Sequence, residues 1–103
     1  MTEDGTSALL RALKGKFPSL RVGFEEIVSR SWASATFIGA RHEIVFILDG
    51  DGAAPAAQAF LANLTDEEFA LRGHLLADIT LVSSEIGNDQ ARLAIEALTV
   101  EDS

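Results

Sequence analysis

The sequence predicts an α+β fold, a two-layer sandwich in which two helices accompany a four-stranded, mostly antiparallel sheet. Apolar residues recur at helical spacing in two segments and at strand spacing in four, in the order α, β, β, α, β, β. The turns between successive strands are short, which is typical of antiparallel pairs. The chain also aligns with itself at an offset of 51 residues with nine identical positions, which suggests a duplicated αββ unit.

The first element is a helix over residues 7–16, which Pro18 ends. Its apolar side chains lie on one side at helical spacing: Leu9, Leu10, Leu13 and Phe17. From Leu20 the apolar period changes to two and continues to Val28, which predicts the first strand.

The second strand is predicted over residues 44–48, a continuous β-branched and aromatic run. Such a run is typical of a strand that is covered on both faces. Residues 49–52 alternate Asp and Gly and predict a turn. The turn of the first hairpin is expected near residues 34–39, which places Arg30 almost opposite Arg41.

The second half begins with a helix that has Pro55 in its first turn and apolar spacing as far as Leu64. Thr65 is followed three residues later by Glu68, as in a capping box. A further short helix is therefore expected to begin at Thr65 and to stop at Gly73.

The last two strands are predicted from alternation over residues 74–81 and 92–97, with a turn at residues 87–89 between them. One domain is expected over residues 1–103, with flexible ends at residues 1–6 and 101–103.

The composition, with 48% hydrophobic and 23% charged residues, is that of a globular protein. The absence of cysteine excludes disulfides, thiolate ligands and a thiol nucleophile. The first residues are acidic, unlike a signal peptide, and the longest aliphatic or aromatic run has five residues. We therefore expect a cytoplasmic protein that does not enter a membrane.

The charge, formally −8, is unevenly distributed. Residues 5–42 carry six cations against two acids, whereas residues 43–103 carry two cations against twelve acids. The net charge disfavours binding to nucleic acid, whose phosphates normally meet a basic face. The positive half can instead receive a small anion or an acidic segment of a partner. Alternatively, the opposite halves of two copies dock head to tail, and the polarity serves assembly.

The candidate ligand-binding site lies at one end of the first hairpin and consists of Arg30, Trp32, Arg41 and His42. Guanidinium groups beside an indole and an imidazole suit an anionic or planar ligand, through bidentate hydrogen bonds and stacking. In the alternative interpretation Trp32 closes the sheet edge or a subunit boundary, and the arginines pair across strands with Glu25, Glu26 or Glu43.

The candidate self-association surface is the face of the sheet away from the helices. Alternation places six large apolar side chains there: Val45, Ile47, Leu76, Val82, Leu98 and Val100. Monomers rarely leave such a patch in water, so a homodimer formed through the sheet is expected. The alternative is a monomer whose first helix covers that face.

Catalytic residues, cofactors and metal ligands are not predicted. His42 and His74 lack metal-binding spacing, and roughly 13 Å of strand separates His74 from Asp78. The Asp-Gly turn lacks the later ligands of a calcium loop and the third glycine of a dinucleotide fingerprint. The expected function is therefore binding or scaffolding. The alternative is a small enzyme with an inter-subunit pocket, a histidine as acid or base, and an arginine that holds an anion.

Overall fold

The computed structural model describes residues 4–102 and contains one antiparallel sheet of four strands in the order β1-β2-β4-β3. The predicted α+β class and the order of helices and strands are confirmed. The elements are α1 (Gly5–Gly15), β1 (Arg21–Ala33), β2 (Ile38–Asp49), α2 (Ala53–Ala62), the 3-10 helix η1 (Leu64–Asp66), β3 (His74–Ile86) and β4 (Gln90–Glu101).

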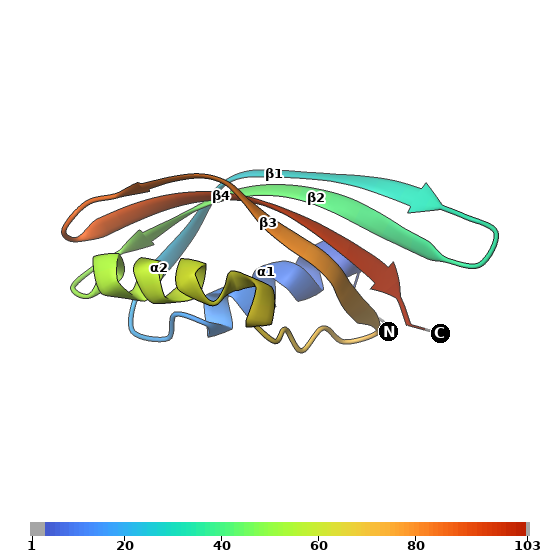
Figure 1. The fold of residues 1–103 in the computed structure, drawn as a ribbon, viewed down its shortest axis with the longest axis horizontal. Coiled ribbons are helices and arrows are strands. Elements are labelled where there is room, and N and C mark those ends of the chain that lie inside the picture. The colour runs from blue at the N-terminus through green and yellow to red at the C-terminus, as the bar shows by residue number, and fades with distance from the viewer. Residues whose placement is uncertain (1–3, 103) are drawn as a thin grey trace.

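Both helices lie under one face of the sheet, which arches over them (Figure 1). The opposite face, here called the open face, has no helix over it in residues 4–102, so the two-layer arrangement holds. One end of the sheet extends past the first turn of α1 (Figure 1). We call this end the overhang, and it comprises residues 29–42, 74–78 and 98–101.

Helix α1 begins at Gly5 because Asp4 caps it. The Asp4 carboxylate accepts a hydrogen bond from the Ser7 amide at 2.7 Å, and this bond holds the pKa of Asp4 below its usual value. The helix therefore starts two residues earlier than predicted.

The ends of the chain are more regular than expected. Gly5 and Thr6 belong to α1, and Glu101 ends β4. Asp4 caps α1, and the Asp102 amide donates to the Gly73 carbonyl. The other residues of the predicted flexible ends, 1–3 and 103, lie outside the described residues.

Alternate residues of the two central strands form the core against the helices. They are His42, Ile44, Phe46 and Leu48 of β2, and Ala91, Leu93, Ile95, Ala97 and Thr99 of β4. The Phe46 ring packs at 6.2–6.4 Å between centroids against Phe17, Phe24 and Phe60.

The expectation that residues 44–48 are covered on both faces is wrong. Val45 and Ile47 lie on the open face and are only half-buried, whereas Ile44 and Phe46 are buried by the helices. The run is continuously apolar because the open face is itself apolar at these positions.

The predicted helix from Thr65 to Gly73 does not form. Only the single turn η1 is helical, and at Glu67 the backbone becomes extended. Lys16, at the end of α1, forms a salt bridge with Glu67 at 2.7 Å and donates to the Glu68 carbonyl. These tertiary contacts override the local capping signal.

The two central strands are related by an approximate two-fold axis at the centre of the sheet, whereas the edge strands depart from it: Arg41 pairs with Arg30, but Arg92 pairs with Glu85. Ile44 of β2 pairs with Ile95 of β4, 51 positions later, which is the offset at which the sequence aligns with itself. The same offset relates Leu9 of α1 to Phe60 of α2, and both are buried. The arrangement therefore supports the suggested duplication.

Candidate functional site

The open face of the overhang is built from two rows of residues that lie side by side across all four strands. The row nearer the tip of the first hairpin, here the apolar row, reads Trp32, Gly39, Val100 and Leu75. The next row, here the arginine row, reads Arg30, Arg41, Leu98 and Asp78. Residues that pair in an antiparallel sheet share a face, so each row presents its side chains together.

Arg30 and Arg41 stand directly opposite each other on β1 and β2, as the sequence predicts. Within residues 4–102 neither guanidinium group forms an ion pair or a side-chain hydrogen bond. The expected alternative, pairing of these arginines with Glu25, Glu26 or Glu43, is therefore not realised. Opposed like charges destabilise an antiparallel pair, so the two guanidinium groups are an unfavourable local contact on the open face.

Two hollows flank the arginine pair on the open face. One, of about 430 Å³, is lined by Arg30, Ser31, Trp32, Arg41 and Leu98. The other, of about 300 Å³, is lined by Val28, Arg30, Arg41 and Glu43. The larger hollow thus combines two cations with an indole and an aliphatic side chain.

Trp32 can lie flat on the sheet because residue 39 has no side chain. A Cβ atom at Gly39 would lie 2.8 Å from Trp32 Cζ2 and 2.0 Å from the carbonyl oxygen of Thr99. The indole Nε1 is buried and has no hydrogen-bond partner within the described chain. A buried N–H without an acceptor is unusual in a folded protein.

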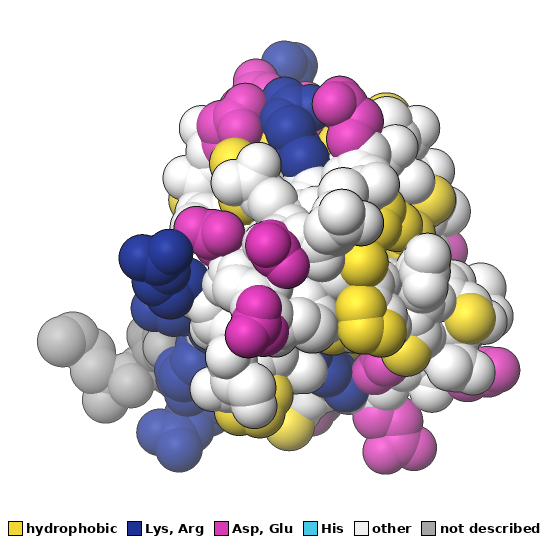
Figure 2. Space-filling view, turned by 90° about the vertical axis from the view of Figure 1, so that its left-hand side faces the viewer, with side chains coloured by type: hydrophobic (Ala, Val, Ile, Leu, Met, Phe, Trp, Pro, Cys, Tyr) yellow, Lys and Arg dark blue, Asp and Glu magenta, His cyan; other side chains and the backbone are white. Residues whose placement is uncertain are grey.

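The two-fold relation provides an internal comparison for Arg41. Its equivalent, Arg92, donates two hydrogen bonds to Glu25 Oε1, at 2.9 and 3.2 Å, and lies 3.7 Å from Glu85. The hydrogen bond from Arg92 holds the pKa of Glu25 below its usual value, and the same contact raises the pKa of Arg92. Figure 2 looks at the end of the molecule opposite the overhang, which is the left-hand end of Figure 1. It shows basic side chains at the top, flanked by acidic side chains.

His42, the fourth predicted site residue, does not join this site. It alternates with Arg41 and therefore points to the helix side of the sheet, where it is completely buried. The prediction that His42 contributes to the same site as Arg30 and Trp32 is wrong, because successive residues of a strand face opposite ways.

His42 is instead the centre of a hydrogen-bond chain that joins α1 to the sheet. Thr6 Oγ1 donates to Ser29 Oγ at 2.9 Å, Ser29 Oγ lies 2.7 Å from His42 Nδ1, and His42 Nε2 lies 2.8 Å from Thr99 Oγ1. Every hydrogen bond in this series has one donor and one acceptor when neutral His42 carries its proton on Nε2, because Ser29 can then donate to Nδ1. Burial lowers the pKa of His42, which favours this neutral form.

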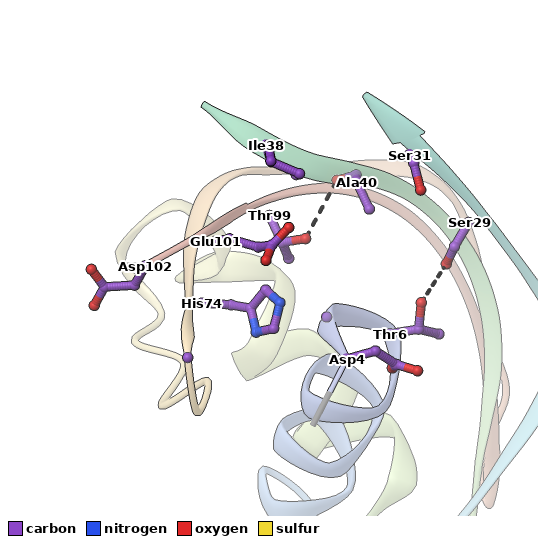
Figure 3. A pocket seen from close by; sticks show the side chains of 13 residues that line it. Asp4, Thr6, Ser29, Ser31, Ile38, Ala40, His74, Thr99, Glu101 and Asp102 are labelled. Carbon is purple, nitrogen blue, oxygen red and sulfur yellow. Dashed lines mark hydrogen bonds between the residues drawn. The ribbon is translucent and has the colours of Figure 1, made fainter. Parts of the chain in front are cut away.

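A cavity of about 610 Å³ opens beneath the overhang, on the helix side (Figure 3). Thr6, Ser29, His74 and Thr99 are among the residues that line it, with Asp4 at the first turn of α1. A serine hydrogen-bonded to a histidine resembles an activated nucleophile. However, His42 is fully buried behind Ser29 and does not line the cavity, so it has no route by which to protonate a leaving group. The series of hydrogen bonds from Thr6 to Thr99 therefore has a structural role.

The predicted self-association residues divide into three groups. Leu98 and Val100 lie on the overhang, while Val45, Ile47 and Val82 lie farther along the open face. The prediction that Leu76 lies on the open face is wrong, because Leu76 pairs with the buried Thr99 and packs against the core on the helix side. A β-bulge between residues 76 and 78 shifts the alternation of β3 at this point.

Acidic residues separate the first two groups. Glu43 and Glu96 stand opposite each other on β2 and β4, immediately after the arginine row, and Glu26 lies in the next row opposite Val45. Together they surround the apolar side chains at the centre of the open face. These carboxylates disfavour a contact that brings the centres of two open faces together. Exposed apolar side chains lie on the overhang, at Phe37, Ile38 and Leu75, and also outside it, at Val82.

Comparison of the chain with family models, with curated proteins and with solved structures finds no significant match. In residues 4–102 no helix is long and apolar enough to cross a membrane. No group of three or more His, Asp or Glu side chains suited to a metal ion occurs in that part of the chain.

Asp78 is the site residue that the sequence does not reveal. It lies in the arginine row, at the edge farthest from Arg30, and is exposed. It reaches this place through the bulge in β3, and simple alternation does not show where such a bulge falls.

Proposed function

We propose that this chain is a binding domain whose open face receives a carboxylate attached to an apolar body, at the arginine pair of the overhang. The observation that carries the proposal is the direct opposition of Arg30 and Arg41, neither of which has an anionic partner within residues 4–102. Like charges opposed across strands are unfavourable by up to about 1 kcal/mol, and an anion between them removes that penalty.

The surroundings of the arginines define the rest of the ligand. Trp32 and Leu98 line the same hollow, so an apolar group can pack against them while two guanidinium groups hold the acid. Guanidinium groups bind carboxylates through paired, charge-assisted hydrogen bonds. An anion that lacks an apolar part would satisfy only half of the site.

Fluorescence of Trp32 provides a direct test, because it is the only tryptophan in the chain. Titration with octanoate is expected to change the emission with saturation, whereas acetate and octylamine have much weaker effects. Arg41→Ala should reduce octanoate affinity about tenfold, which corresponds to one charge-assisted contact. Arg92→Ala, at the equivalent but already paired position, is the matched control and should bind octanoate normally.

An unchanged Trp32 emission at millimolar octanoate would exclude the proposed site. Equal titration curves for the wild type and Arg41→Ala would exclude the role of the arginine pair.

Self-association is a second function, and the apolar row favours it. Leu75 of β3 is 56% exposed, and at the tip of the β1–β2 hairpin Phe37 and Ile38 are 57% and 55% exposed. Apolar groups gathered at one end of a small domain are typical of a protein-protein contact. Sedimentation velocity between 1 and 200 µM is expected to show a reversible dimer, and a monomer throughout that range would count against this function.

A further inference from the structure

We propose that the carboxylate received by Arg30 is Asp78 of a second copy of this chain, in a symmetric dimer formed by the two overhangs. This inference rests on the proposed carboxylate site. It names the occupant of that site and the geometry by which the occupant reaches it.

The order of side chains in the arginine row is self-complementary. The row reads cation, cation, apolar residue and anion from β1 to β3: Arg30, Arg41, Leu98 and Asp78. A two-fold rotation about an axis along the strands, between β2 and β4, reverses this order in the second copy. Arg30 then lies opposite the partner's Asp78, and the aliphatic part of Arg41 lies opposite the partner's Leu98.

Both charged ends of the row are available for this contact. Asp78 is exposed and, like Arg30, forms no ion pair or side-chain hydrogen bond in residues 4–102. The symmetry produces the pair twice. Each dimer therefore compensates two positive and two negative charges that the single chain leaves unpaired.

The apolar row matches itself under the same rotation. Trp32 lies opposite the partner's Leu75, and the indole over Gly39 meets the partner's Val100. These contacts bury the most exposed apolar side chain of the row, Leu75. The hydrophobic contact and the ion pairs therefore require the same orientation of the two copies.

The remainder of the open face limits the contact to the overhang. The next row would place Glu43 opposite the partner's Glu96, which is repulsive. The sheet arches toward the helices on its other side (Figure 1), so two open faces that touch at the overhang diverge toward the acidic centre. The curvature thus allows the favourable rows to meet while the acidic rows stay apart.

Charge exchange tests the geometry. The dimer dissociation constant is measured by sedimentation for the wild type, Arg30→Asp, Asp78→Arg and the double variant. Each single change should weaken the dimer about tenfold, because it replaces two exposed ion pairs with two like-charge contacts. The double variant restores opposite charges across the interface and should return to within about threefold of the wild type.

Lys14→Asp is the matched control, because it makes the same change in charge at an exposed position of α1, away from the open face. It should leave the dissociation constant unchanged. Thermal melts establish that each variant is folded, which is expected because Arg30 and Asp78 are both exposed.

The outcomes separate this inference from the proposed function. Asp78→Arg keeps both arginines, so it should still bind octanoate by Trp32 fluorescence while its dimer is weakened. Octanoate binding by a protein that stays monomeric would overturn the inference and leave the carboxylate site standing. The inference would also be overturned if the double variant did not recover the wild-type dissociation constant. If the dimer formed but octanoate did not bind, the overhang would not be a ligand site for carboxylates.

Discussion

Ser29 Oγ lies 2.7 Å from His42 Nδ1 and connects a fully buried imidazole to the first turn of α1 through the hydroxyl of Thr6. The imidazole is held neutral between hydroxyl groups, and no carboxylate hydrogen-bonds to it in residues 4–102. This arrangement makes the attachment of α1 to the sheet dependent on the protonation state of His42.

Folding stability is expected to fall when the pH drops below about 6.5. Burial lowers the pKa of His42 in the folded protein below the ordinary value of 6.5, so the unfolded chain binds a proton that the folded chain excludes. The contribution is complete above pH 6.5 and is lost as the pH falls through the folded pKa, at no more than about 1.4 kcal/mol per pH unit.

Urea unfolding of the wild type and His42→Gln between pH 7.5 and 5.0 measures this effect. The variant should show a flatter profile, because His74 is then the only remaining histidine. Parallel profiles for the two proteins would show that His42 does not determine the pH dependence. Loss of the Asp4 cap is separable, because the backbone hydrogen bond from Ser7 holds the pKa of that carboxyl below its usual value, outside the pH range of the experiment.

Ser29→Ala is expected to destabilise the protein by about 1–3 kcal/mol. The change removes the acceptor for Thr6 Oγ1, and it also removes the donor to Nδ1 of a fully buried histidine. Ser31→Ala is the matched control. Ser31 lies two residues later on the same face of β1 and forms no hydrogen bond through its side chain in residues 4–102. Equal unfolding free energies for the two variants would contradict a structural role for the Ser29 hydroxyl.

Gly39→Ala is expected to destabilise the protein by about 1–3 kcal/mol and to shift Trp32 emission to longer wavelength. A Cβ atom there meets the backbone oxygen of Thr99 and the indole ring, so the ring must move away from the sheet. Gly23→Ala tests the same substitution in β1, where no atom lies within 4 Å of the added carbon. It should leave the emission unchanged, and an unchanged emission for Gly39→Ala would show that the ring does not depend on this glycine.

Periodicity predicts the fold well because both central strands alternate regularly. The buried residues of β4 recur at every second position without interruption, and the buried residues of α1 recur at helical spacing. The predicted helix from Thr65 to Gly73 is the departure, and a tertiary contact explains it. Thr65 has a valid capping signal, but Lys16 of α1 holds the following segment extended, and local sequence does not encode that contact.

The candidate site could be predicted in part. The placement of Arg30 opposite Arg41 follows from the position of the hairpin turn, and the structure confirms it. Nearness in sequence groups His42 with them, but strand alternation places its side chain on the other face. Leu76 and Asp78 depend on a bulge in β3, which shifts the faces by one residue and has no distinct signal in the sequence.

The offset of 51 residues relates Arg41 to Arg92, and we predict opposite consequences when each is replaced. Arg41→Thr removes one of two opposed cations that have no anionic partner in residues 4–102, and Thr is well suited to a strand. The free energy of unfolding should therefore stay the same or rise by up to about 1 kcal/mol. Arg92→Thr breaks two hydrogen bonds to Glu25 Oε1 and leaves Glu25 and Glu85 without their cation, so stability should fall slightly. Chemical denaturation at dilute concentration, where association does not contribute, measures both values. The loss of stability in Arg92→Thr should be smaller in 0.5 M salt, because the ion pair between Arg92 and Glu25 is exposed. If Arg41→Thr lowered the free energy of unfolding as Arg92→Thr does, Arg41 would already have a compensating partner within the chain.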